Sequence, residues 1–305
     1  MKEPVFTGSC TALITPFAEG GERPDLERMG KLLDFQAEGG TAAVVLAGTT
    51  GENATLTQRE YERLVEFAAG YVDGRMKLIV GIGGNDTARC VEKARFASAA
   101  GADAVLMTTP YYNKTTQQGV LRHFSVAADA AEVPLILYNV PSRTAIGISA
   151  DTYQALSRHT NINGVKEASG DFTLIAYLAA ECGETLHLWC GNDDQTIPMM
   201  ALGALGVISV VSNVLPAEVT KLCALCSAEN FTGARAEYAR WAEFGRLLFR
   251  ETNPIPVKAA MRLAGLDCGE LRLPLVDLSP ESLEMLKASM RQLGLYPVKP
   301  TVAKI

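Results

Sequence analysis

The sequence contains little histidine and tryptophan and has no excess of positive charge. Its 305 residues include 3 histidines and 2 tryptophans, and 28 lysines and arginines against 34 acidic residues give a formal net charge of −6. An acidic chain has no electrostatic attraction to nucleic acid or to an anionic membrane, so neither is an expected partner. His123, His159 and His187 are not spaced with cysteine or carboxylate residues as metal ligands are, so no metal site is predicted.

The sequence also lacks a recognisable export signal and an uninterrupted membrane span. The N-terminal stretch MKEPVFTGSCTALITPF has no unbroken apolar run, which predicts a cytoplasmic protein. Residues 195–217 carry no charge, but proline, glycine and asparagine interrupt them. We interpret this segment as a short helix, a glycine turn and a buried strand.

The cysteines show no disulfide or metal-binding pattern. They are odd in number, seven in all, and scattered along the chain, which predicts reduced and buried thiols. Cys223 and Cys226 form a CxxC pair within a helical pattern, and we expect both to face the core instead of serving redox or metal chemistry.

Eight short runs of β-branched and apolar residues are the main structural signal. Continuous apolar runs of this kind are typical of parallel strands buried on both faces. Between them lie amphipathic helical patterns, one of which opens with a capping box, TQRE at 57–60. The runs are CTALITPF (10–17), AAVVLA (42–47), KLIVGIGG (77–84), AVLMTTP (104–110), PLILYNV (134–140), INGVKEAS (162–169), LHLWCGND (186–193) and GVISVVSN (206–213).

This alternation predicts the α/β class, and in particular a (β/α)8 TIM barrel with a C-terminal helical extension. We assign residues 1–225 to the barrel and residues 226–305 to the helical part, where helical patterns occur near 232–250, 256–265 and 280–293. A doubly wound sheet is the structural alternative, but it usually has fewer strands.

Polar residues follow several of the predicted strands. In a barrel of this kind the catalytic groups gather at the carboxyl ends of the strands. The second run ends in AGTTGEN (47–53), the fourth in TTPYYNK (108–114), the fifth in LYNVPSRT (137–144), and the sixth contains Lys166. These side chains should therefore meet at one mouth of the barrel.

Lys166 is the most unusual of them, because it interrupts an apolar run. It could be a lysine that extends its stem to solvent, or it could be catalytic. Burial disfavours the charged form of an amine, and a neutral amine can attack a carbonyl to form an imine, which then acts as an electron sink. Tyr138, one strand away, is either a proton donor and acceptor or an aromatic residue of the core.

The other candidates have similar alternatives. The GTTG turn at 48–51 offers backbone amides and hydroxyls to a carboxylate, or is a simple glycine turn. Arg143 is either a bidentate carboxylate ligand or a solvated charge. Tyr111 and Tyr112 could be interface aromatics. GIGGND at 81–86 matches no nucleotide-binding fingerprint and is interpreted as a strand end leading into a helix cap. Together the candidates indicate a lysine-imine enzyme acting on a keto acid.

With these motifs in view, the chain resembles the dihydrodipicolinate synthase family, which belongs to the pyruvate-dependent class I aldolases together with the N-acetylneuraminate lyases. The resemblance runs from about residue 5 to about residue 292. It implies a (β/α)8 barrel with C-terminal helices, and a homo-oligomer that is usually a tetramer built as a dimer of tight dimers. The motifs are GTTGE (48–52), TPYYN (109–113), LYNVPSRT (137–144), GVKEASGD (164–171), GVISV (206–210) and NPIPVK (253–258).

The resemblance also implies a reaction and its residues. Pyruvate and L-aspartate 4-semialdehyde would condense through a lysine Schiff base, with no metal or nucleotide cofactor, in the diaminopimelate and lysine pathway. The implied catalytic residues are Lys166 as the imine-forming amine and Tyr138, Thr49 and Tyr112 as a proton relay, with Tyr112 supplied by the neighbouring subunit. The implied substrate-binding residues are Thr50 for the pyruvate carboxylate, Arg143 for the carboxylate of the second substrate, and Gly191 and Ile208 through their backbone.

Two features favour the synthases within this group. The lyases usually read GSTGE where this chain has GTTGE, and they lack an arginine matching Arg143. A lyase acting on N-acetylneuraminate or another keto acid remains the alternative, and a non-enzymatic paralogue would have no use for Lys166.

The chain departs from many relatives at the site where lysine inhibits them. There the family often carries histidine and glutamate, and the matching positions here are Gln58, Tyr61 and Arg89, although Asn85 and Tyr111 persist. An arginine is electrostatically wrong for binding a cationic inhibitor. We therefore expect weak or absent inhibition by lysine.

Overall fold

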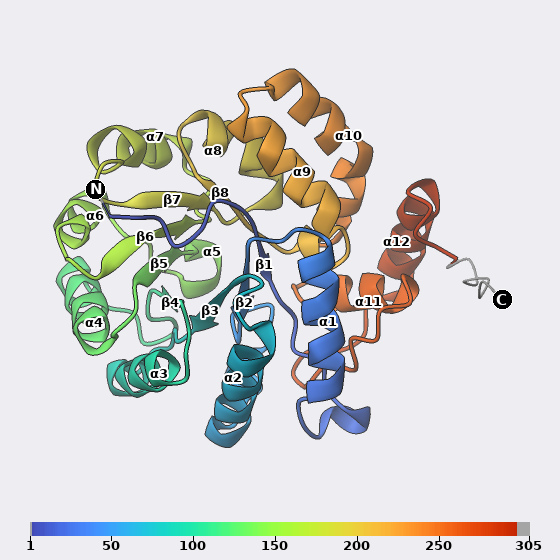
Figure 1. Cartoon of the computed structure of the whole chain (residues 1–305), viewed down its shortest axis with the longest axis horizontal. Coiled ribbons are helices and arrows are strands. Elements are labelled where there is room, and N and C mark those ends of the chain that lie inside the picture. The colour runs from blue at the N-terminus through green and yellow to red at the C-terminus, as the bar shows by residue number, and fades with distance from the viewer. Residues whose placement is uncertain (1, 298–305) are drawn as a thin grey trace.

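Residues 2–297, the part of the chain that the computed structural model describes, form a closed barrel of eight parallel strands. Each strand pairs with the next one along the chain, and β8 closes the barrel on β1 (Figure 1). The predicted (β/α)8 architecture is confirmed, and the doubly wound alternative is wrong because the sheet has no open edge. The strands are β1 Gly8–Ala12, β2 Ala43–Leu46, β3 Lys77–Gly81, β4 Ala104–Thr108, β5 Leu135–Asn139, β6 Ile162–Glu167, β7 His187–Cys190 and β8 Gly206–Ser209.

Seven of the eight predicted apolar runs contain a whole strand, because both faces of the sheet are covered, whereas the run at 10–17 begins within β1 and extends past its end. Side chains that point inward fill the barrel, and those that point outward pack against the helices, so β2, β5, β6 and β8 are buried along their whole length. The helices that surround the barrel are α1 Leu26–Glu38, α2 Gln58–Val72, α3 Thr87–Ala99, α4 Gln117–Ala130, α5 Pro141–Thr144, α6 Ala150–Ser157, α7 Phe172–Glu181, α8 Thr196–Ala201 and α9 Pro216–Ser227. Short 3-10 turns are η1 Glu19–Gly21, η2 Asn53–Thr55, η3 Asp193–Gln195 and η4 Val211–Asn213.

Side-chain caps define where most of the longer barrel helices begin. The predicted capping box is present: Thr57 Oγ1 accepts from the Glu60 amide at 3.3 Å, and Glu60 Oε2 accepts from the Thr57 amide at 2.9 Å. The GIGGND segment also leads into a cap, as predicted, with Asp86 as the capping residue. The further caps are Asp25 for α1, Thr116 for α4, Ser149 for α6 and Asp171 for α7.

Within residues 2–297, three helices follow the barrel, close to the predicted helical patterns. They are α10 Phe231–Leu247, α11 Ile255–Leu263 and α12 Pro280–Gln292. They gather on the side of the barrel next to α9 and α1 (Figure 1). The division predicted between residues 225 and 226 falls within α9 and stays a prediction, and residues 298–305 of the predicted helical part lie outside the described residues.

Residues 195–217 and the Cys223–Cys226 pair both belong to the barrel. Residues 195–217 contain α8, a turn at Gly203 and the buried strand β8, as interpreted from the sequence. No helix within residues 2–297 combines the length and the apolar character needed to cross a membrane. Cys223 and Cys226 are both buried in α9, and all seven cysteines are free and buried.

Candidate active site

A cavity of about 470 Å³ opens at the carboxyl ends of the strands, where the sequence placed the polar candidates. Side chains from the loops after β2, β4 and β5 surround it, together with the end of β6 and part of the C-terminal region. The predicted site residues that line the cavity are Thr49, Thr50, Tyr138, Arg143, Lys166 and Gly191.

Lys166 lies beneath this mouth, on β6. It pairs in register with Tyr138 of β5, so both side chains point to the same face of the sheet, into the barrel. The lysine is only 5% exposed, and its Nζ lies 4.4 Å from the centroid of the Tyr138 ring. An amine in this position can reach a carbonyl bound in the cavity, with the phenol beside it.

The loop after β2 presents the second group. Thr50 is 3% exposed, and its Oγ1 accepts a hydrogen bond of 2.8 Å from Nδ2 of Asn253. Because the hydroxyl oxygen accepts from Asn253, its own proton is free to donate to a bound carboxylate. Ala47 and Glu52, on either side of the turn, have φ of 50° and 55°, a left-handed conformation that is unfavourable for residues other than glycine.

Arg143 lies on α5, after the stiff Val140–Pro141 turn, and is exposed at the mouth. Its Nη2 donates to the backbone carbonyl of Asn253 at 3.2 Å. Asn253 thus contacts Thr50 through its side chain and Arg143 through its backbone. Sequence reasoning gave Asn253 no role, and the only available signal was its place in the NPIPVK motif.

Glu167 was also missed as part of the structure around the site. It points away from the cavity and is fully buried, where it accepts hydrogen bonds from Tyr153 Oη (2.7 Å), from Asn139 Nδ2 (3.0 Å to Oε2) and from the Ser169 amide (2.7 Å). A buried carboxylate needs partners of this kind. These bonds fix the end of β6. They therefore also fix the backbone of Lys166, which directly precedes Glu167 on the strand.

Gly191 approaches the lysine so closely that no side chain would fit. A Cβ there would lie 2.6 Å from Ala168 Cβ and 3.2 Å from Lys166 Cε. Ile208 is fully buried and does not line the cavity, whereas Val210 does. The backbone role implied for Ile208 stays a prediction.

Asp193, just after β7, is a buried carboxylate near this wall. It accepts from Ser209 Oγ and from the amides of Val210 at 2.9 Å and Val211 at 3.3 Å. Burial raises the pKa of this carboxyl, and the three donors and the charge of Lys166 act in the opposite direction. Asp193 therefore stabilises the turn after β8, next to the cavity wall.

Tyr112 does not reach the cavity of its own chain. It is 91% exposed with φ of 68°, whereas its neighbour Tyr111 lines the cavity. The role implied for Tyr112 at a neighbouring subunit's site stays a prediction.

Of the residues at the expected inhibitor site, Tyr111 lines the cavity, whereas Tyr61 and Arg89 do not. Tyr61 is fully buried, Arg89 is exposed beside Asp86, and Lys93 extends its Nζ to within 4.5 Å of the Tyr61 ring centroid. Lys93 also donates to Asn53 Oδ1 at 3.0 Å. A cation of the protein itself therefore already occupies the face of Tyr61.

Among residues 2–297 no three histidine, cysteine or acidic side chains are grouped as metal ligands would be. What the site offers is a buried amine, a phenol and two groups suited to carboxylates. A closed (β/α)8 barrel with such an amine at its mouth is the arrangement of a class I aldolase-type lyase.

Comparison with known proteins gives the family. The Dihydrodipicolinate synthetase family matches residues 5–293, and the chain belongs to this family. A 4-hydroxy-tetrahydrodipicolinate synthase of Thermoanaerobacter sp. (strain X514) is 45% identical over 293 residues, which cover 96% of this chain and 98% of the relative.

Solved structures agree with this assignment. The crystal structure of dihydrodipicolinate synthase from Aquifex aeolicus is 43% identical, with a TM-score of 0.93 over 96% of this chain and all of that one. A protein described as the first monomeric dihydrodipicolinate synthase variant is 38% identical, with a TM-score of 0.92 over 95% of this chain and 98% of that one.

Proposed function

We propose that this protein condenses pyruvate with L-aspartate 4-semialdehyde to give 4-hydroxy-tetrahydrodipicolinate, on the route to diaminopimelate and lysine. The observation that carries the proposal is the buried Lys166 facing Tyr138 in the cavity at the barrel mouth. The proposal is also supported by the name of the similar proteins, 4-hydroxy-tetrahydrodipicolinate synthase.

The reaction begins at Lys166. Its neutral amine attacks the ketone carbon of pyruvate, and water leaves to give a protonated imine. The methyl group then loses a proton, and the electron pair of that C–H bond forms an enamine while the iminium is neutralised. The enamine carbon attacks the aldehyde of the second substrate, whose oxygen takes a proton and becomes the hydroxyl. Finally the amino group of that substrate attacks the imine carbon, closes the ring and releases Lys166.

The surrounding residues bind the substrates and move protons. Thr50 and the amides of its turn hold the pyruvate carboxylate, and Arg143 receives the carboxylate of the aldehyde. Tyr138, Thr49 and Tyr112 form the proton relay. The protonated imine accepts the electron pair of the broken C–H bond, as an electron-accepting cofactor would otherwise do. The reaction therefore uses no metal or nucleotide cofactor.

The active form is a cytoplasmic homo-oligomer, and we favour a tetramer built as a dimer of dimers. The support for association is Tyr112, which extends from its own chain into solvent at 91% exposure next to the site. Light scattering gives the assembly size, and a monomer with full activity would overturn the role of Tyr112 as a donor from the partner.

The alternative is a lyase for N-acetylneuraminate or another keto acid, using the same imine. Arg143 favours the synthase, because it lies at the mouth and is held by the Asn253 carbonyl. Turnover with aspartate semialdehyde but not with N-acetylneuraminate is the expected outcome, and the reverse preference would establish the alternative.

Borohydride reduction in the presence of pyruvate, followed by peptide mass mapping, tests the central step. We expect one carboxyethyl adduct, the reduced pyruvate imine, on the peptide that contains Lys166. Lys166→Ala should abolish it, whereas the control Lys31→Ala, at an exposed lysine paired with Glu27, should not. Arg143→Ala should spare the adduct and weaken the use of the aldehyde. An adduct that persists in Lys166→Ala would refute the proposal.

A further inference from the structure

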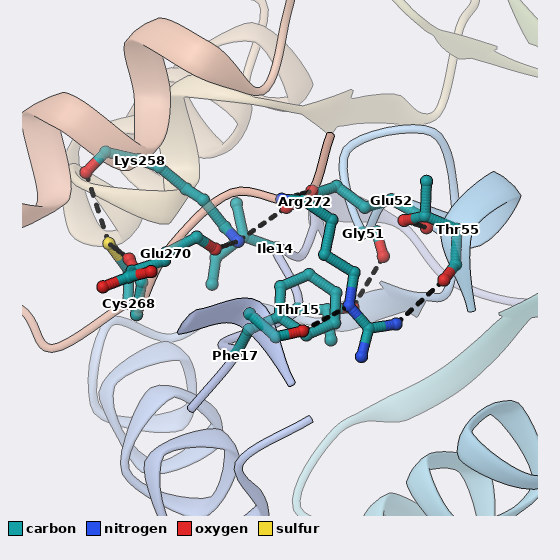
Figure 2. Close-up of polar contacts among 12 residues, drawn as sticks. Ile14, Thr15, Phe17, Gly51, Glu52, Thr55, Lys258, Cys268, Glu270 and Arg272 are labelled. Atoms are coloured by element: carbon teal, nitrogen blue, oxygen red, sulfur yellow. Dashed lines mark hydrogen bonds and ion pairs between the residues drawn. The ribbon is translucent and has the colours of Figure 1, made fainter. Parts of the chain in front are cut away.

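A buried ion pair joins the loop after β2 to the C-terminal helices. Nζ of Lys258, in the first turn of α11, lies 2.6 Å from Oε1 of Glu52, and the two side chains are 0% and 1% exposed (Figure 2). Neither group has a place in the imine chemistry. Glu52 lines the cavity, however, and follows Thr50 by two residues.

Both charges have further partners, so the pair has one well-defined arrangement. Lys258 Nζ also donates to the carbonyl of Glu270 at 2.6 Å, and it lies 4.6 Å from the centroid of the Phe17 ring. Glu52 Oε2 accepts from the backbone amide of Arg272 at 3.1 Å. Figure 2 shows the lysine extending from α11 between these groups toward the loop that carries Glu52.

The stability of the fold does not by itself explain a buried pair of charges such as Glu52 and Lys258. Two charges taken out of water often stabilise a fold no more than apolar residues of the same volume would, and the best-attested role of buried ion pairs is to select one arrangement over others. The arrangement at stake here is the turn that carries Thr50. Its flanking residues Ala47 and Glu52 are held in left-handed conformations, which persist only where the surrounding structure enforces them.

The same end of α11 holds the turn at a second point. Asn253, which immediately precedes the Pro254 cap of α11, donates to the Thr50 hydroxyl at 2.8 Å. Asn253 and Lys258 thus contact alternate residues of one turn, Thr50 and Glu52. The C-terminal helices fix the orientation of the Thr50 hydroxyl and of the backbone amides beside it.

We propose that Lys258 is a positioning residue for keto-acid binding: through its ion pair with Glu52 it holds the Thr50 turn in the shape that receives the carboxylate of the acid bound at Lys166. This inference rests on the proposed function. It concerns how the turn is held, and it adds no group to the reacting atoms.

A double-mutant cycle separates positioning from stability. The variants are Glu52→Gln, Lys258→Met and the two combined, each measured for thermal unfolding, for the pyruvate KM and for the rate of borohydride-trapped adduct formation at low pyruvate. Each single variant leaves one buried charge without its partner and should lose both stability and pyruvate affinity. The double variant leaves no lone charge, so its unfolding temperature should return toward that of the wild type.

The decisive value is the pyruvate KM of the double variant. We expect it to stay raised by about tenfold or more, because small misplacements of binding groups have large kinetic effects. The matched control is Arg262→Met, which removes a surface ion pair to Asp277 from the same helix and should keep the wild-type KM.

Two outcomes have separate meanings. A double variant that recovers stability together with the wild-type KM and trapping rate overturns the positioning role and leaves the proposed function intact. A wild-type protein that forms no pyruvate adduct overturns the proposed function itself. If a single variant fails to fold, the double variant still decides the question.

Discussion

Removing the Tyr153 hydroxyl tests how much the hydrogen bonds to the buried Glu167 carboxylate, next to Lys166 on β6, contribute to the stability of the fold. Tyr153 is fully buried in α6, and its Oη donates to Glu167 Oε2 at 2.7 Å. Burial, and then the charge of Glu167, raise the pKa of this phenol well above its usual value, so it remains a donor near neutral pH. Tyr153→Phe keeps the ring and deletes only the donor.

The expected loss can be estimated from the structure. A hydrogen bond to a charged group contributes about 1.5–3 kcal/mol, and Glu167 would keep its bonds from Asn139 and Ser169. We therefore expect Tyr153→Phe to lower the free energy of unfolding by about 2 kcal/mol. The slope of that free energy against urea concentration should stay unchanged. Urea titration at fixed protein concentration measures this, because association also affects apparent stability.

The chain contains a matched control at its surface. Tyr71 Oη donates to Asp34 Oδ2 at 2.7 Å, the same length as in the buried pair, but the tyrosine is exposed. Exposed polar pairs contribute little because water replaces the lost partner. Tyr71→Phe should therefore leave the urea midpoint unchanged. Equal effects of the two substitutions would refute the reasoning that burial sets the magnitude.

Three further predictions follow from other parts of the structure. The hydrogen bond from Arg272 lowers the pKa of Glu60 to about 2, below its unfolded value, so their pair stabilises the fold above about pH 4.3 and that contribution is lost as the pH falls toward 2. Glu60→Gln should cost about 1–2 kcal/mol near neutral pH, after allowance for solvent screening, and this cost should disappear as the pH falls through about 2; a pH-independent difference in urea titrations would contradict this. L-Lysine should inhibit weakly or not at all because of Arg89 and of Lys93 over the Tyr61 ring, and half-maximal inhibition at sub-millimolar lysine in a steady-state assay would refute this. Burial raises the pKa of the Cys90 thiol to about 11, so iodoacetamide should label this residue slowly in the native protein at neutral pH. Labelling of Cys90 at the rate of a free thiol would refute this prediction.

The sequence alone determined the barrel and the place of Lys166 at its mouth. Strand and helix signals are local: a buried strand shows a run of β-branched residues, and a helix start shows a capping residue such as Thr57. Lys166 was recognisable because a charged residue in such a run conflicts with its surroundings. The strand ends of a barrel meet at one mouth, so the convergence of Lys166 with Tyr138 and Thr50 followed from the fold class.

Only the tertiary structure decided how the C-terminal helices take part in the site. Asn253 and Thr50 are 203 positions apart, and nothing local in either segment indicates that one donates to the other. The same holds for Lys258 and Glu52, whose buried pair forms only when α11 packs over the closed barrel. Local sequence patterns fix conformations over a few residues, whereas contacts between distant segments depend on the packing of the whole chain.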